Sequence, residues 1–114
     1  MTTQITIRKA PGKYVVRAGG AVLGESSDVL ELSEGTLAPV LYFPRSAIAM
    51  AFLEPSGTTS QCPMKGVATH YSVVTKSTTL TDIAWSYEAP LDAASDIAGH
   101  LSFSARDTLA VEQL

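Results

Sequence analysis

Short runs of β-branched and aromatic residues, separated by glycine and proline turns, are the feature that most restricts the fold of this chain. Ile5 and Ile7 alternate with polar residues, which is the period-two pattern of a half-buried strand. Residues 14–16 form a second such run, and two glycines separate them from residues 21–23, as in a hairpin. Runs this short and this closely bounded by turns predict a mainly β, antiparallel architecture.

Later segments extend this pattern to the end of the chain. Further strands are expected over residues 29–32, 40–43, 67–74, 80–87, 100–103 and 108–111, and residues 56–60 are expected to form a loop. The sequence therefore predicts two antiparallel sheets with one or two short helices between the strands.

The first helix is expected over the alanine-rich residues 47–53, with Ser46 as a plausible N-cap and Pro55 as a stop. The second is expected over residues 89–98. Pro90 and Asp92 suit its first turn, and Gly99 suits the position just after its end.

Composition narrows the class of protein. The chain has 114 residues, of which 46% are hydrophobic and 17% are charged, so it can bury a core and is not of the disordered class. The net charge of −3 argues against binding to nucleic-acid backbone. The longest apolar run is far shorter than the roughly 20 residues that cross a bilayer, and the N-terminus has no signal-like core. We expect one cytoplasmic domain over residues 1–114, with neither a membrane nor a nucleic acid as partner.

Charged residues are concentrated in the first third of the chain. The basic residues are Arg8, Lys9, Lys13 and Arg17, and the acidic residues are Glu25, Asp28, Glu31 and Glu34. Neither group forms an unbroken run, so we interpret them as solvated faces joined by cross-strand ion pairs, and not as a binding surface.

Two residues are candidates for catalysis. Cys62 is the single cysteine, which excludes an internal disulfide, and Lys65 three residues later could favour its thiolate. A small buried packing residue is the alternative at this position. His100 follows the second expected helix and could be a general base or a structural histidine. His70 lies inside an expected strand and is interpreted as structural, and no metal site is predicted from so few ligands.

Other residues are candidates for ligand binding. Arg45 beside a helix start could form an anion cradle, or it could form a surface ion pair. Trp85 and Tyr87 are two residues apart on one strand, so both rings should share a face that is either a pocket wall or core.

Five ordered blocks of this sequence resemble the bacterial domain-of-unknown-function family 427. They are LYFPR (41–45), TSQCPMKG (59–66), HYSV (70–73), AWSYEAP (84–90) and IAGHLSF (97–103), with a departure at Met64, where an aromatic residue is expected. The resemblance implies a fold similar to β-tent proteins, in which two antiparallel sheets leave a cleft between them. Several relatives of that fold hold zinc with pairs of cysteines, and a single Cys62 implies that this zinc is absent here. The family also carries a nucleotidyltransferase label, but the blocks hold no paired carboxylate for magnesium.

The matching blocks define one candidate pocket. Its ligand-binding residues are expected to be Tyr42, Arg45, Lys65, Tyr71, Trp85 and Tyr87, with Cys62 and His100 as candidate catalytic residues. Cations and aromatic rings suggest a small anionic or planar ligand. This hypothesis requires Arg45, Lys65 and the two rings of Trp85 and Tyr87 to converge on one concavity.

Two further functions stay open at this point. One is an enzyme that uses Cys62 or His100 for chemistry while Arg45 and Lys65 hold an anionic group. The other is a non-catalytic module that forms a homodimer through an exposed strand edge. The sequence names no cofactor.

Overall fold

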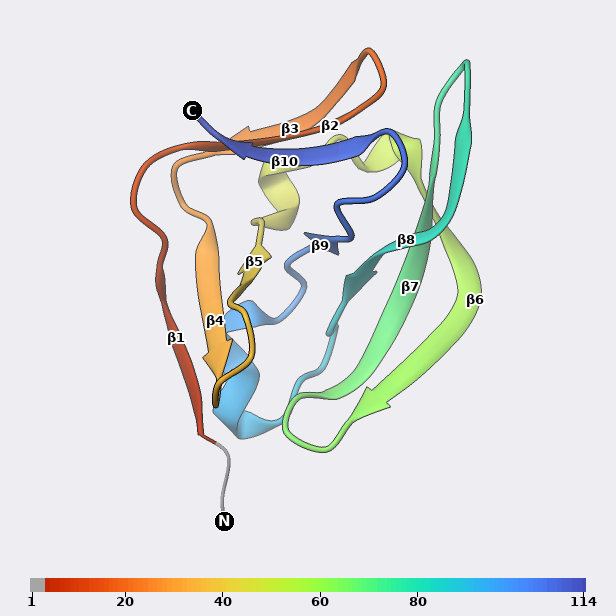
Figure 1. Cartoon of the computed structure of the whole chain (residues 1–114). Helices are drawn as coiled ribbons and strands as arrows, with labels where there is room; N and C mark the ends of the chain where they lie inside the picture. Colours follow the sequence, from red (N-terminus) through yellow and green to blue (C-terminus); the bar gives the residue numbers. More distant parts are fainter. Residues whose placement is uncertain (1–3) are drawn as a thin grey trace.

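A computed structural model describes residues 4–114, in which ten strands form three antiparallel sheets (Figure 1). The strands are β1 (Ile5–Lys9), β2 (Tyr14–Ala18), β3 (Ala21–Ser26), β4 (Leu30–Glu34), β5 (Val40–Tyr42), β6 (Leu53–Cys62), β7 (Gly66–Val74), β8 (Thr79–Ser86), β9 (Ser102–Phe103) and β10 (Leu109–Gln113). The mainly β, antiparallel prediction is confirmed, and every predicted strand overlaps an observed one. The strands divide into three sheets where two were expected.

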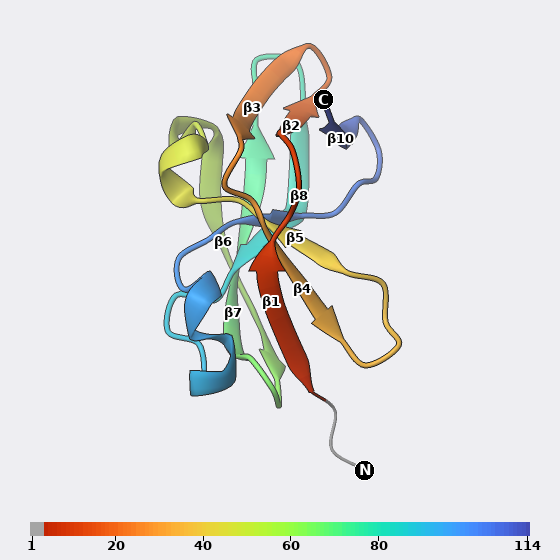
Figure 2. The same ribbon diagram turned by 90° about the vertical axis from the view of Figure 1, so that its left-hand side faces the viewer.

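The three sheets have the strand orders β1-β4-β5, β10-β2-β3 and β6-β7-β8-β9. Figures 1 and 2 show that the β2–β3 and β7–β8 hairpins extend to the same end of the molecule. Two isolated bridges tie the sheets together, one between Phe43 and Leu101 and one between Gly24 and Ile48. Phe43 and Leu101 exchange both backbone hydrogen bonds, at 2.8 and 2.9 Å, which fixes the end of β5 beside β9.

Both helical segments are shorter than predicted. Residues 47–53 contain the last residue of one 3-10 turn, η1 (Arg45–Ala47), and all of a second, η2 (Met50–Phe52). Pro44, not Ser46, holds the N-cap position of η1. The reason is tertiary: Ile48 is extended and bridges Gly24, and the Ala49 amide donates to the Leu23 carbonyl at 2.7 Å. Strand pairing therefore overrides the helix propensity of alanine.

The second helical segment is η3 (Asp92–Ile97), a pair of 3-10 turns merged across the non-helical residue Ala94. Gly99 follows it with a φ of 71°, the left-handed conformation that suits glycine after a helical segment, as predicted. In the part of the chain that the structure describes, no helix is long and apolar enough to span a membrane.

The loop predicted over residues 56–60 is wrong, because these residues belong to β6. β6 is an edge strand that pairs only with β7, and its register shifts between Pro55 and Thr59. A bulge accommodates Gly57 at a φ of 85°. A solvated edge also tolerates the proline and the polar residues that made this segment resemble a loop.

The cross-strand ion pairs predicted for the first third of the chain are confirmed. They join Arg8 to Glu31 at 2.9 Å, Lys9 to Asp28 at 3.3 Å and Lys13 to Glu25 at 2.8 Å. Arg17 instead pairs with Glu112 of β10 at 3.0 Å, outside the predicted acidic group. Glu34 is the exception among the acidic residues of this region, because its carboxylate turns to Lys65.

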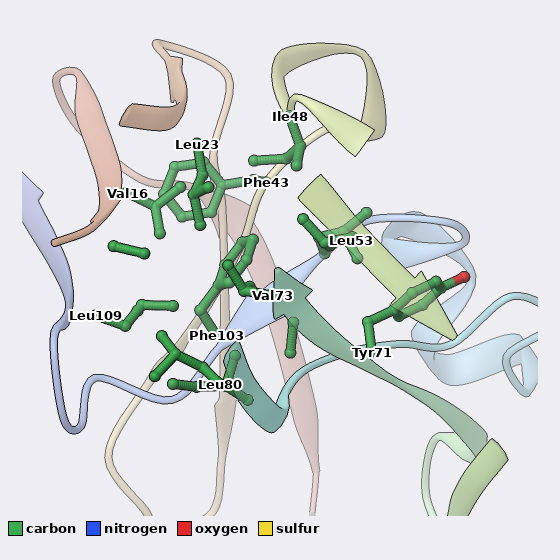
Figure 3. Packing of buried hydrophobic residues seen from close by; sticks show 14 of the residues in the cluster. Val16, Leu23, Phe43, Ile48, Leu53, Tyr71, Val73, Leu80, Phe103 and Leu109 are labelled. Atoms are coloured by element: carbon green, nitrogen blue, oxygen red, sulfur yellow. The ribbon is translucent and has the colours of Figure 1, made fainter. Parts of the chain in front are cut away.

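Buried side chains form two clusters. The larger one packs residues of β2, β3 and β10 against β7 and β8, with Phe43 and Phe103 meeting edge to face at 6.0 Å (Figure 3). The smaller one includes Leu32, Tyr42, Ala68 and Tyr87. Adjacent residues of a strand point to opposite faces, so β7 sends Tyr71 to the larger cluster and Ala68 to the smaller one.

Candidate functional site

A cavity of about 270 Å³ lies between β5, the β6–β7 hairpin and the end of β8. It is lined by Val40, Tyr42, Ser60, Lys65, His70, Trp85 and Tyr87, and we call it the tyrosine pocket. Its walls come from segments far apart in the sequence, so only the folded chain forms it.

Strand register places the aromatic wall. Trp85 of β8 lies directly opposite His70 of β7, and Tyr87 follows Trp85 two residues later, just beyond the strand. The turn that carries Lys65 is fixed by a 2.9 Å hydrogen bond from the Leu91 amide to the Lys65 carbonyl. Gly66 closes that turn with a φ of 109°, a conformation that glycine adopts without strain.

Lys65 is the cation of the pocket, and its charge is already paired. Its Nζ lies 3.0 Å from Oε1 of Glu34, and the two side chains are only 12% and 18% exposed. The same Nζ lies 5.8 Å from the ring centroid of Tyr87. Burial disfavours the charge of Lys65, but the hydrogen bond to Glu34 and the nearby phenols outweigh it and leave its pKa above the usual value. Lys65 is therefore protonated and neutralised.

The two phenols of the pocket are neutral donors. Burial raises the pKa of Tyr42, and hydrogen bonding to Trp85 and the charge of Lys65 offset part of that rise. Burial also raises the pKa of Tyr87, again opposed by Lys65. Both hydroxyls thus keep their protons at neutral pH and can donate to a ligand.

His70 and Ser60 add a polar edge. The Nε2 of His70 lies 2.8 Å from the Ser60 hydroxyl, while its Nδ1 is buried and has no hydrogen-bond partner among residues 4–114. A serine nucleophile needs a histidine whose second nitrogen is oriented by a carboxylate or similar group. The described part of the chain supplies no such group, so this pair offers polar contacts and not an activated nucleophile.

Arg45 belongs to a different cluster. Its Nη2 contacts both carboxylate oxygens of Glu88 at 2.7 and 2.8 Å, and its Nε donates to the Gly99 carbonyl at 3.1 Å. The Tyr71 hydroxyl donates to the same carboxylate at 2.6 Å. We call Arg45, Tyr71 and Glu88 the arginine cluster.

The electrostatics of the arginine cluster are mutually stabilising. Burial disfavours the charge of Arg45, but Tyr71 and Glu88 outweigh it and raise its pKa. Burial and the hydrogen bond to Glu88 raise the pKa of Tyr71. The cluster therefore persists at neutral pH and joins η1, β7 and the segments after β8 and η3.

A family model described as domain of unknown function (DUF427), with the label NTP_transf_9, matches residues 6–113. The chain belongs to this family. The resemblance inferred from the five sequence blocks is thereby confirmed. Among curated proteins, none matches this DUF427 chain.

In this DUF427 protein the sequence-predicted ligand residues divide into two groups. Tyr42, Lys65, Trp85 and Tyr87 line the tyrosine pocket, whereas Arg45 and Tyr71 belong to the arginine cluster. The division follows from β7, where His70 and Tyr71 are adjacent and point to opposite faces. Arg45 and Lys65 thus do not converge on one concavity, and each is paired with a carboxylate.

The two candidate catalytic residues also lie apart. Cys62 is half-buried at the end of β6 and packs against the smaller cluster. His100 lies beside the arginine cluster, with its Nδ1 3.1 Å from the Ala98 carbonyl. Among the described residues, no hydrogen bond joins Cys62 to His100, and no group of three His, Cys, Asp or Glu side chains is arranged to hold a metal ion.

Sequence reasoning missed four residues of these two sites. The sequence pattern favours a structural role for His70 and places Ser60 in a loop. The signal that identifies His70 is alternation along β7, which places it on the same face as Ala68 and opposite Trp85. Glu34 and Glu88 lie 31 and 43 residues from the cations they neutralise, and no local pattern identifies them.

Proposed function

We propose that the tyrosine pocket binds a small planar ligand without net charge. The observation that carries this proposal is the ion pair of Lys65 and Glu34, which leaves the pocket electrically balanced while aromatic rings form much of its wall. Of the two ligand types suggested by the sequence, anionic and planar, this balance favours the planar one. An anion would have to compete with Glu34 for the ammonium group.

The polar groups of the pocket specify the edge of such a ligand. The hydroxyls of Tyr42 and Tyr87 keep their protons and can donate to a ring nitrogen or a carbonyl oxygen. The ammonium protons of Lys65 that do not face Glu34 can donate as well. A flat ring with hydrogen-bond acceptors at its edge therefore matches the lining best.

The intrinsic fluorescence of Trp85 tests this proposal, because Trp85 is the single tryptophan of the chain and lines the pocket. Two probes that share the 4-hydroxyphenyl ring and differ in charge and one methyl group are titrated: methyl 4-hydroxybenzoate, which is neutral, and 4-hydroxybenzoate, which is an anion. The neutral ester should change the fluorescence at lower concentration than the anion.

Glu34→Gln supplies the sharper arm of the test. The substitution leaves Lys65 without a counter-charge, so the affinity for 4-hydroxybenzoate should rise about tenfold, the effect of one charge-assisted hydrogen bond. Glu25→Gln, which breaks an exposed pair elsewhere, is the matched control and should change neither probe. Tighter binding of the anion to the unmodified protein, or an unchanged preference in Glu34→Gln, would refute the proposal.

The enzyme alternative predicted from the sequence has less support. It depends on Cys62 or His100 with anion binding by Arg45 and Lys65, and both cations are occupied by carboxylates. No contact of the described residues favours the homodimeric alternative over a monomer, and size measurement in solution by light scattering tests it directly.

A further inference from the structure

A second cavity of about 260 Å³ adjoins the tyrosine pocket. Its walls include Leu41 of β5, Phe43 just after that strand, Phe103 of β9 and Val111 of β10. We call it the apolar cavity, because aliphatic and aromatic side chains form most of its lining.

The two cavities share a wall. Val40 and Trp85 line both of them. Strand register explains why: His70, Trp85 and Ser102 are successive cross-strand partners on β7, β8 and β9, so they form a row across one face of the sheet. His70 lines the tyrosine pocket at one end of this row, and Ser102 lines the apolar cavity at the other. Trp85 stands between them.

Size supports a joint role. Small-molecule sites usually enclose about 300–1,000 Å³. Each cavity falls just below this range, whereas both together fall within it. Trp85 is half-buried, so its indole is not locked in place by complete burial.

We infer that the ligand is elongated, with a planar polar head in the tyrosine pocket and an apolar arm that passes Trp85 into the apolar cavity. This inference rests on the proposed function, since it places the planar ligand in the tyrosine pocket. It adds that the ligand is amphipathic and that Val40 and Trp85 contact it at the junction of its two parts.

A series of 4-hydroxybenzoate esters with methyl, butyl and hexyl chains tests the inference through Trp85 fluorescence. Each methylene buried in the apolar cavity should lower the dissociation constant about fourfold, which corresponds to about 0.8 kcal/mol per methylene. The gain should stop once the cavity is filled.

Ala105→Phe separates binding in the cavity from unspecific adhesion of longer chains. Ala105 is exposed and lines the apolar cavity but not the tyrosine pocket, so the larger side chain should block the arm and leave the head site intact. The methyl ester should bind this variant as it binds the unmodified protein, and the gain with chain length should disappear. Ala105→Ser is the matched control and should keep the gain, and Ala105→Leu provides a smaller block should the phenylalanine variant unfold.

The outcomes distinguish the two proposals. Binding of the methyl ester without any gain from longer chains overturns the inference and leaves the proposed function standing. A gain that survives in Ala105→Phe likewise overturns it, because the chains then bind elsewhere. Absence of binding by every ester overturns both proposals.

Discussion

Removing one partner of the ion pair of Lys65 and Glu34 should destabilise the fold much more than removing one partner of the pair of Lys13 and Glu25, although both join lysine to glutamate. The distances are nearly equal, at 3.0 and 2.8 Å. What differs is exposure: the side chains of Lys65 and Glu34 are 12% and 18% exposed, against 52% and 42% for Lys13 and Glu25. The two pairs therefore isolate the effect of burial on one chemical interaction.

The expected magnitudes follow from that exposure. Removing one partner of a fully buried ion pair costs about 3–5 kcal/mol, because the other charge is left without compensation. Since Lys65 and Glu34 retain some contact with water, we expect about 2–3 kcal/mol for Glu34→Gln or Lys65→Met. An exposed pair contributes about 0.2–1 kcal/mol, so Glu25→Gln and Lys13→Met should each cost less than about 1 kcal/mol.

Urea unfolding of the four single variants and the two double variants gives a coupling energy for each pair. We expect a clearly larger coupling between Lys65 and Glu34 than between Lys13 and Glu25. Salt should weaken the exposed pair and leave the buried pair nearly unchanged. Equal coupling energies, or equal sensitivity to salt, would show that the pocket is as wet as the surface and would remove the basis for a neutral ligand.

Three further predictions concern Gly24, Tyr42 and Cys62. Gly24→Ala should lower the free energy of unfolding by about 1–3 kcal/mol, because the added methyl group would clash with the Ala47 carbonyl. Gly20→Ala is the control and should leave the stability unchanged, because the space around Gly20 is open. Equal shifts of the melting temperature in the two variants would contradict this prediction. The free energy of unfolding should fall above about pH 10, because the pKa of Tyr42 is raised in the folded protein and the unfolded chain releases this proton near 10.0. The stability that Tyr42 contributes is therefore complete below pH 10 and is lost as the pH rises through the raised pKa. Urea unfolding with tyrosine absorbance measures this, and a loss already complete at pH 9 contradicts it. Iodoacetamide should alkylate half-buried Cys62 more slowly in the folded protein than in urea, and equal rates by mass spectrometry would show a free, reactive thiol.

Sequence pattern predicts the strands well where side chains alternate or are β-branched, as along β7 and β8. It fails where tertiary contacts decide the backbone. The helix expected over residues 47–53 is replaced by strand pairing at Ile48, because Gly24 has no side chain and lets the two backbones meet. Residues 56–60 resemble a loop in sequence, because an edge strand with a bulge can consist of glycine, serine and threonine.

The candidate site, like the fold, is predictable from the sequence only in part. Family blocks and strand alternation place Tyr42, Lys65, Trp85 and Tyr87 together, and these four residues do line one pocket. Pairing of the cations was beyond prediction, because each carboxylate partner lies more than thirty residues away in the sequence. The sequence leaves an anionic or a planar ligand open, and our proposal of a planar, uncharged one rests on this pairing, which is the feature of the site least visible in the sequence.

The arginine cluster is nonetheless connected to the tyrosine pocket through the backbone of Tyr87. Glu88 directly follows Tyr87 and is held by Arg45 at 2.7 Å, and the Gly99 amide donates to the Tyr87 carbonyl at 3.1 Å. Arg45 also holds Gly99 in place, because its Nε donates a hydrogen bond to the carbonyl of that residue. The guanidinium of Arg45 is thus connected to the segment that carries the Tyr87 ring in two ways, through Glu88 and through Gly99. If the proposed function holds, Arg45 acts on the pocket as a positioning residue and not as a ligand-binding residue, which accords with its place in the family blocks and its absence from the pocket wall.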